Sequence, residues 1–377
     1  MKYRKFGSSD FQVSVLGFGC MRFPTQSSQP GDIDEGKAAS MLDYAIERGV
    51  NYLDTAYPYH AGESEPFLGR FLQGKHRDRV KLATKLPCWK VEAEADLDRL
   101  LNEQLDRLRT ERIDFYLLHA LHAKGWKKMS SLNVLSWLER AQQDGRIGLV
   151  GFSFHDQYPA FKEIIDDYQG WDFCQIQYNY MDQDYQAGRK GMKYAAQKGL
   201  AVVVMEPIRG GQLVDPPPRV QKIWDRSPIR RTPAAWALQW LWDQPEIALV
   251  LSGMSEMSHV VENVREAERA EAGLLSGEEH SVLEKVRQAY QELALIPCTG
   301  CEYCLPCPEG VGIPRILEIY NEGQMFGKPE TARQAYSQRL SEAKRADRCL
   351  RCGECEESCP QSIQIMDWLE RIHHDLS

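Results

Sequence analysis

The feature that most constrains the fold is a regular alternation between short apolar runs and longer amphipathic stretches, from residue 13 to about residue 270. The apolar runs are rich in β-branched and aromatic residues, as expected for strands buried on both faces. The stretches between them carry apolar residues at three- and four-residue steps, which predicts helices. The predicted strands are residues 13–19, 51–55, 80–85, 113–119, 147–153, 173–179, 201–206 and 247–253.

Eight strands, each followed by a helix, predict a (β/α)8 TIM barrel, for which about 250 residues is typical. A doubly wound sheet is the competing α/β architecture, but eight units within about 270 residues favour closure. Residues 2–13 are predicted to form a short hairpin that plugs the bottom of the barrel. Beyond the barrel (residues 1–275), we expect a helical connector at 276–297 and a small, mainly helical domain at 298–377.

Charge and hydropathy exclude several classes of protein. The formal net charge is -8, which argues against a nucleic-acid partner or an anionic membrane surface. No apolar run approaches the roughly 18 residues of a membrane span, and the basic N-terminal segment lacks the apolar core of a secretory signal. We therefore expect a cytoplasmic protein.

Cysteine is distributed unevenly along the chain. Three of the 11 cysteines are scattered over the first 297 residues, and the other eight fall into two groups near the end. In a reducing compartment, such grouping favours metal ligands over disulfides. The first group is Cys298, Cys301, Cys304 and Cys307, and the second is Cys349, Cys352, Cys355 and Cys359.

The spacing within these groups predicts two [4Fe-4S] clusters. The second group fits the ferredoxin run C-x2-C-x2-C-x3-C-P completely, and the first is one residue shorter before its last cysteine. In two-cluster ferredoxins the fourth cysteine of each run ligates the other cluster, so we expect Cys307 and Cys359 to exchange partners. Zinc is the competing interpretation, but four-ligand zinc sites do not explain the third closely spaced cysteine or the Cys-Pro ends. The helical insert between the runs resembles the helical ferredoxin domains of respiratory iron-sulfur subunits.

Polar residues at the carboxyl ends of barrel strands are the catalytic candidates. These positions hold Asp54, Lys85 and His119, and two tyrosines, Tyr57 and Tyr59, follow Asp54 closely. Taken singly, each has a structural interpretation: a capping aspartate, a solvated lysine, a packed histidine. Their occurrence at consecutive strand ends instead predicts one shared site.

The segments NYLDTAYPYHAGESE, KLATK and DFYLLH resemble the Asp, Tyr, Lys and His segments of the aldo-keto reductase family, over about residues 1–270. In that family the tyrosine stands five residues after the aspartate, which selects Tyr59 over Tyr57. The resemblance implies reduction of a small-molecule aldehyde or ketone, with Tyr59 as general acid. We expect Lys85 to lower the pKa of Tyr59, Asp54 to orient Lys85, and His119 to donate a hydrogen bond to the carbonyl.

The resemblance also implies a nicotinamide cofactor, NADP or NAD, at the same mouth. Family positions that hold the nicotinamide amide match Ser153 and Gln175, and those that bind the adenine match Glu262 and Asn263. Residues 206–213 match the loop that covers the pyrophosphate. The expected cofactor contacts are Ser153, Gln175, Met205, Glu206, Pro207, Arg209, Gly210, Gly211, Gly253, His259, Glu262 and Asn263.

The sequence departs from the family pattern in three places, and the third leaves the choice of NADP or NAD open. Phe154 replaces an asparagine that usually shares the amide, and Met205 stands where an aromatic often stacks on the nicotinamide. Residues 252–259 lack the lysine and arginine that commonly grip the 2′-phosphate, and a phosphate without cationic partners is poorly held.

Two hypotheses for the whole chain remain. In the first, the barrel is an oxidoreductase whose iron-sulfur tail adds electron transfer, with a redox protein as partner. In the second, the barrel retains modest activity and the tail is a structural or redox-sensing module that docks a partner. Nicotinamides exchange two electrons as hydride whereas each cluster passes one, and the sequence shows no flavin motif to mediate between them.

Overall fold

The computed structural model describes residues 1–73 and 76–377, which form two compact units. The first unit comprises Met1–Gly211 and Ala234–Ser276, and the second comprises Gln212–Pro233 and Gly277–Ser377. The segment Gln212–Pro233 therefore leaves the first unit in mid-sequence and belongs to the second. None of the described helices is long and apolar enough to cross a membrane.

In the described residues, the first unit contains a closed barrel of eight parallel strands, which confirms the predicted (β/α)8 fold. Each strand pairs with its sequence neighbours, and the last strand closes the barrel against the first. The barrel strands are β3 (Leu16–Gly19), β4 (Tyr52–Asp54), β5 (Lys81–Leu86), β6 (Ile113–Leu121), β7 (Ile147–Phe154), β8 (Phe173–Gln177), β9 (Ala201–Met205) and β10 (Ile247–Ser252).

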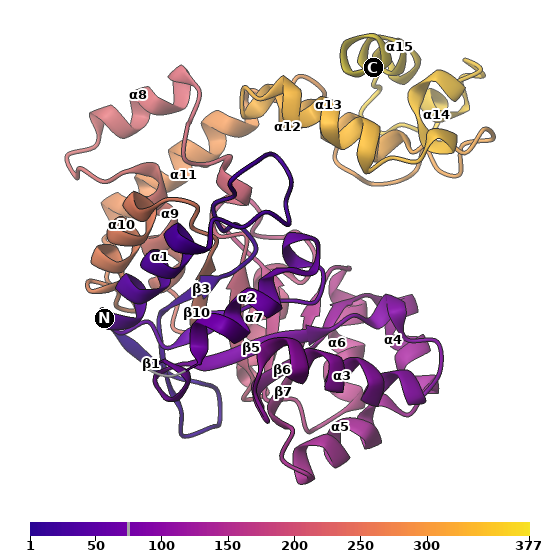
Figure 1. Cartoon of the computed structure of the whole chain (residues 1–377). Coiled ribbons are helices and arrows are strands. Elements are labelled where there is room, and N and C mark those ends of the chain that lie inside the picture. Colours follow the sequence, from indigo (N-terminus) through magenta and orange to yellow (C-terminus); the bar gives the residue numbers. More distant parts are fainter. Residues whose placement is uncertain (74–75) are drawn as a thin grey trace. The chain divides into compact units, whose positions relative to one another are not determined.

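Helices cover the outer side of the strands (Figure 1). Helix α1 shows why: Asp34 caps its first turn by accepting a hydrogen bond from the Lys37 amide at 3.1 Å, and its apolar residues Met41 and Leu42 are buried. The helices of this unit are α1 (Glu35–Glu47), α2 (Ser64–Leu72), α3 (Ala95–Leu108), α4 (Ala123–Ser131), α5 (Val134–Gln143), α6 (Tyr158–Asp167), α7 (Gly188–Gln197), α9 (Pro233–Trp242) and α10 (Met257–Ala267).

The predicted N-terminal hairpin is present as β1 (Tyr3–Lys5) paired antiparallel with β2 (Gln12–Ser14). Between these strands, Phe6 is fully buried and its ring packs 4.8 Å from Phe115 and 5.3 Å from Phe173. The predicted strand 13–19 is wrong in its extent, because Val15 interrupts it: β2 of the hairpin ends at Ser14 and barrel strand β3 begins at Leu16. One apolar run therefore serves two sheets.

The second unit is mainly helical, as predicted for the insert between the cysteine groups. A buried apolar core from α12 and α15 holds it together, including Ile316, Leu317, Leu369 and Ile372. Six of the eight clustered cysteines pack against this core. Its helices are α8 (Pro218–Arg226), α11 (Gly277–Gln291), α12 (Ile313–Met325), α13 (Pro329–Gln338), α14 (Glu354–Glu357) and α15 (Ile365–Leu376).

Candidate active site and cysteine cavities

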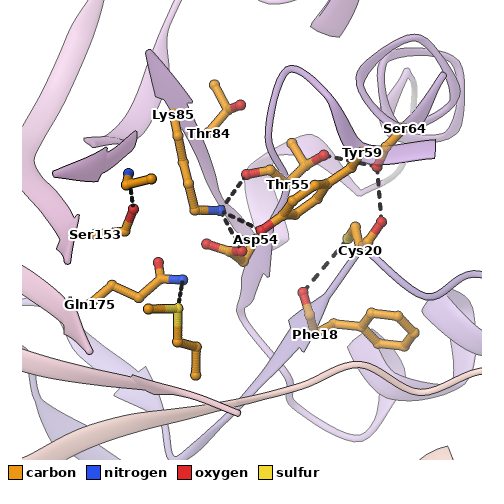
Figure 2. Close-up of polar contacts among 12 residues, drawn as sticks. Phe18, Cys20, Asp54, Thr55, Tyr59, Ser64, Thr84, Lys85, Ser153 and Gln175 are labelled. Carbon is orange, nitrogen blue, oxygen red and sulfur yellow. Dashed lines mark hydrogen bonds and ion pairs between the residues drawn. The ribbon is translucent and has the colours of Figure 1, made fainter. Parts of the chain in front are cut away.

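Lys85 and Asp54 form a fully buried ion pair between neighbouring strands β5 and β4. The ammonium Nζ donates to Asp54 Oδ1 at 2.7 Å, to the Thr55 carbonyl at 2.7 Å and to Tyr59 Oη at 3.4 Å (Figure 2). The Lys85 side chain is 1% exposed and that of Asp54 is 3% exposed. Three acceptors match the three N–H bonds of an ammonium, so the lysine has one defined orientation.

Tyr59 follows β4 in a short 3-10 turn, and its ring faces the same ammonium. Lys85 Nζ lies 4.9 Å from the centre of the Tyr59 ring. The neighbouring Tyr57 is turned elsewhere, because its hydroxyl donates to Glu103 at 2.9 Å and its ring contacts Arg107. The structure thus brings Tyr59, and not Tyr57, to Lys85.

Burial shifts the pKa values of Tyr59, Lys85 and Asp54. It raises the pKa of Tyr59 above that of a free phenol, although Lys85 acts in the lowering direction that the sequence predicted. The expectation of a more acidic Tyr59 is therefore wrong in net direction, because burial outweighs the ammonium. Burial lowers the pKa of Lys85, but the opposing effect of Asp54 and Tyr59 is larger. The net pKa of Lys85 is therefore raised, and the lysine is charged at neutral pH. The pKa of the Asp54 carboxyl is raised by burial against the opposing effect of Lys85.

His119 lies on β6, the next strand of the barrel, where the pairing with β7 shifts register between Leu118 and Leu121. Burial lowers the pKa of His119 well below its ordinary value, and the charges of Lys85 and His155 add to this effect. The imidazole is therefore neutral at neutral pH. Its buried Nδ1 has no hydrogen-bond partner among the described residues. Its ring lies 6.3 Å from that of Tyr59, so both line one site.

A second buried network lies behind Lys85. The Glu65 carboxylate accepts from Thr84 Oγ1 and from Gln104 Nε2, each at 2.7 Å. Gln104 Nε2 also donates to the Lys85 carbonyl at 3.1 Å, and Gln104 Oε1 accepts from the Tyr116 hydroxyl at 2.7 Å. These contacts join α2 and α3 to β5 and β6, and they hold the strand that carries Lys85.

Three of the expected cofactor residues lie at adjoining strand ends. The Ser153 hydroxyl accepts from the Ala120 amide at 2.7 Å, and Gln175 Nε2 donates to Met205 Sδ at 3.6 Å. The buried Gln175 Oε1 has no partner among the described residues. An orphaned amide oxygen at this place fits a carboxamide N–H. Phe154, which departs from the family pattern, packs on Phe161 with ring centres 5.0 Å apart.

The loop after β9 holds Glu206, Pro207 and residues 209–211. Pro207 is buried, whereas Gly210 and Gly211 have φ angles of 62° and 94° that favour glycine. The Arg209 guanidinium, an expected phosphate contact, donates from Nε to Asp182 Oδ2 at 2.8 Å. The sequence did not predict Asp182 as a partner of Arg209, because the spacing between the two residues follows no helical or strand period.

The remaining expected cofactor residues surround the start of α10. Asn263 is buried and donates from Nδ2 to Ser252 Oγ at 3.0 Å. Glu262 is half-buried, and both Gly253 and His259 are exposed. The structure thus places the adenine-side candidates together after β10.

In the second unit, the clustered cysteines line two cavities. One cavity, of about 20 Å³, is lined by four cysteines. The other, of about 260 Å³, is lined by five. Cys304 contributes to both walls, Cys359 lines the cavity of the first run, and Cys307 lines the cavity of the second run. The first set is Cys298, Cys301, Cys304 and Cys359; the second is Cys304, Cys307, Cys349, Cys352 and Cys355.

The fit of a cluster differs between the two cavities. The smaller one has room for about one water molecule, so its walls must move apart for a four-iron cluster. Within 1–73 and 76–377, no three His, Cys, Asp or Glu side chains converge closely enough to hold a single metal ion. The donor set itself, thiolates alone, is the one that iron-sulfur clusters use.

Relatives of known sequence and structure match most of the chain. It is 26% identical over 302 residues to the uncharacterized oxidoreductase YqkF of Bacillus subtilis, which covers 71% of this chain and 91% of the relative. It is 25% identical to a 6-dehydroglucose reductase of Novosphingobium aromaticivorans, covering 69% of this chain and 88% of that protein. The solved aldo-keto reductase AKR11C1 of Bacillus halodurans superposes with a TM-score of 0.62 and 28% identity, covering 76% of this chain and 96% of that one.

Two family models match consecutive parts of the chain. The 4Fe-4S dicluster domain matches residues 297–364, which include all eight clustered cysteines. The Aldo/keto reductase family model matches residues 15–287, which is more than half of the chain and contains the whole barrel. This chain is therefore an oxidoreductase that belongs to the aldo/keto reductase family and carries a 4Fe-4S dicluster domain after its barrel.

Proposed function

We propose that the barrel reduces a small-molecule aldehyde or ketone to an alcohol, with Tyr59 as the proton donor. The contacts of Lys85 carry this proposal, since one fully buried ammonium touches both Asp54 and the Tyr59 hydroxyl. A carbonyl oxygen gains negative charge as hydride is added to its carbon, so it needs a proton donor beside it. One relative is named a reductase of 6-dehydroglucose, which supports reduction as the reaction.

Tyr59 is suited to donate because burial keeps its phenol protonated at neutral pH. As the proton leaves, the phenolate that forms faces the Lys85 ammonium at 3.4 Å and is stabilised by it. Asp54 keeps this ammonium charged and fixed in direction. The Lys85–Asp54 ion pair thus stabilises the Tyr59 phenolate that forms when the proton is transferred.

His119 is the proposed group that positions the carbonyl. A neutral imidazole donates one N–H, and the lowered pKa keeps His119 neutral at neutral pH. A neutral donor orients the substrate oxygen without competing with Tyr59 for the role of acid.

When bound, a nicotinamide cofactor would supply the hydride. Ser153, Gln175 and Met205 would hold its carboxamide end, and the orphaned Gln175 oxygen supports this assignment. Glu262 and Asn263 would hold its adenine, and the loop at 206–211 its phosphates. Both NADP and NAD stay open, because residues 252–259 contain no lysine or arginine to bind a 2′-phosphate.

The test is the variant Tyr59→Phe in the full-length protein. Loss of the general acid should lower kcat about 10²- to 10⁴-fold, while the affinity for the cofactor is unchanged. Steady-state kinetics with a panel of aldehydes and ketones, together with cofactor titration, measure both quantities.

Tyr57→Phe is the matched control, since it removes the same hydroxyl from a ring that contacts Glu103 and Arg107. It should keep nearly full activity. If Tyr59→Phe is as active as the natural protein, or if the two variants lose activity equally, Tyr59 is not the acid.

We also propose that the second unit holds two [4Fe-4S] clusters that transfer electrons to an external redox protein. Cys298, Cys301, Cys304 and Cys359 would ligate one cluster, and Cys307, Cys349, Cys352 and Cys355 the other. The two cavities support these sets, because each is lined by the cysteines of its set. Residues 276–297, most of which form α11, would connect this iron-sulfur domain to the barrel.

Each cluster carries one electron at a time, so a two-electron hydride donor needs a mediator between it and the clusters. A flavoprotein has the required chemistry, because a flavin accepts a hydride and passes on single electrons, whereas a ferredoxin exchanges single electrons with the clusters only. The alternative is that the clusters are structural or sense redox state, in which case no electrons pass between them and the barrel.

The visible spectrum of anaerobically purified protein distinguishes these roles. A broad iron-sulfur absorption that is bleached by NADPH or NADH with a flavoprotein mediator supports electron transfer. Bleaching by dithionite alone assigns the clusters to the structural or sensing role. Absence of this absorption, with zinc found by elemental analysis, would disprove the cluster assignment.

A further inference from the structure

The larger of the two cysteine-lined cavities has an exposed apolar rim. Leu350 is 73% exposed and Tyr303 is 69% exposed, the two highest values among the large apolar side chains of the described residues. Both line this one cavity, and so does Leu305, which is 39% exposed. Tyr303 and Leu305 flank Cys304, and Leu350 follows Cys349, so both cysteine runs contribute. These three side chains are called the exposed rim below.

The smaller cavity differs in this respect. Its large apolar side chains are Leu317, Ile363 and Ile365, and each is at most 6% exposed. Packing within the second unit therefore accounts for the apolar wall of the smaller cavity, but not for the exposed rim of the larger one. Exposed apolar side chains that gather at one place mark a surface that another molecule covers.

Negative charge accompanies the exposed rim. Among the described residues, the charged side chains that line the larger cavity are Glu309 and Glu354, and both are exposed. Residues 298–310 and 349–360 together contain five glutamates and one arginine. Thiolates bound to iron would add negative charge at the same place. The wall of this cavity thus combines apolar and acidic groups.

The cations closest in sequence do not cancel this charge. Arg351, inside the second run, is engaged by two carboxylates, since it donates to Asp367 at 2.6 Å and to Glu370 at 2.9 Å. Arg348 precedes the run and does not line the cavity. A partner that covers the exposed rim therefore meets an acidic surface, which a basic protein complements.

We propose that the exposed rim, with Glu309 and Glu354, docks a redox protein that presents its cofactor edge within a basic face. The inference rests on the proposed function, in which an external protein exchanges electrons with the clusters. The rim lines the same cavity as the proposed ligands of one cluster, so a partner seated on it is close to that cluster. Close approach is needed because the rate of electron transfer falls steeply with distance. Interfaces of redox partners are small, and complementary charge speeds their association.

Cytochrome c is the probe, because it is a basic protein that accepts one electron at an exposed haem edge. The full-length protein is purified anaerobically, reduced with dithionite that is then removed, and mixed with ferric cytochrome c by stopped flow. Each ferric haem takes up one electron from the reduced protein and becomes ferrous. The second-order rate constant is measured at low and at high salt. Calorimetric titration of the two oxidised proteins, between which no electron passes, measures affinity without turnover.

Leu350→Asn should lower both the rate constant and the affinity about 5- to 30-fold, as for loss of an apolar anchor of an interface. This loss should persist at high salt, because the contact is not ionic. Tyr303→Ser tests the same rim from the first cysteine run. The double variant Glu309→Gln with Glu354→Gln should lower both quantities about 2- to 10-fold at low salt and leave the rate constant unchanged at high salt. Iron content and visible absorption show that each variant has assembled its clusters.

Leu295→Asn and Glu330→Gln are the matched controls. Leu295 is 47% exposed and Glu330 is exposed, and both belong to the second unit. Neither lines a cysteine cavity. Each control makes the same chemical change as a rim variant, and each should react with cytochrome c and bind it as the natural protein does.

Rim variants that behave as the controls would overturn the assignment, and so would a natural protein that does not bind cytochrome c at low salt. Sedimentation tests a different occupant: a dimer that Leu350→Asn converts to a monomer would assign the exposed rim to a second copy of the chain. Absence of iron-sulfur absorption from the natural protein would instead remove the proposed function on which the inference rests.

Discussion

The barrel site and the cysteine cavities satisfy their polar groups in different ways. In the barrel, the Lys85 ammonium has protein acceptors for its donors and is fully buried. In the second unit, the clustered cysteines are partly or fully exposed and line cavities. Protein atoms alone thus fix the geometry of the first site. The clustered cysteines, in contrast, need a bound metal centre to hold them in place.

This difference predicts which site is independent of its cofactor. A buried ion pair whose ammonium has three protein acceptors holds its geometry without a ligand, and removal of one partner is costly. Thiolate ligands around a metal centre are held by the metal, so the free energy of metal binding becomes free energy of folding. We expect the two units to respond differently to the same treatments.

Removal of iron should give the largest contrast. On the proposed cluster assignment, anaerobic chelation removes the bonds that fix the segments 298–312 and 349–353, which precede α12 and α14. Structural metals contribute many kcal/mol to folding, so cleavage within these segments should accelerate at least about 100-fold. Limited proteolysis followed by mass spectrometry locates the cuts.

The barrel is the internal control for this treatment. Its strands should stay protected, and cofactor binding should be retained. Equal protection of the cysteine segments before and after chelation would show that the apolar core of α12 and α15 fixes them without metal.

A smaller effect is expected from pH, and it belongs to the barrel alone. The pKa of His119 is well below its ordinary value in the folded protein, whereas the unfolded chain takes up a proton near pH 6.5. The stability that neutral His119 contributes is therefore present above pH 6.5 and lost as pH falls. Relative to His119→Gln, the natural protein should lose about 1.4 kcal/mol between pH 7.5 and pH 5.5.

Urea unfolding of both proteins at the two pH values, followed by tryptophan fluorescence, measures this loss. His119→Gln cancels the contributions of all other titrating groups, since these are common to both proteins. A difference that does not change with pH would mean that His119 has the same pKa in the folded and in the unfolded chain.

Much of the barrel was predictable because its information is local. Parallel strands buried on both faces are continuous apolar runs, and strand ends place Asp54, Lys85 and His119 in sequence order. The break at Val15 was missed, because both halves of one apolar run are buried, in different sheets. Apolar character alone does not show where a strand changes partner.

Pairwise contacts between distant residues were not predictable in this way. The Arg209–Asp182 pair and the Glu65–Gln104 network each join side chains whose spacing follows no helical or strand period. The acidity of Tyr59 was misjudged for a related reason, since the sequence shows a neighbouring lysine but not the burial that outweighs it. The crossed cysteine sets stay a prediction, which rests on ferredoxin spacing as a local pattern of the sequence.

The route of the chain through Gln212–Pro233 limits how the protein can be divided. This segment lies between β9 and α9 in sequence, and within the second unit an ion pair joins Arg219 on α8 to Glu292, the residue that follows α11. The peptide backbone consequently passes between the units three times, and one cut cannot release either of them intact. A chain shortened to residue 276 would keep α8, with Trp224 buried on it, but would lack its partner helix. The iron-sulfur unit could be transplanted to another barrel only if part of the barrel's own sequence went with it.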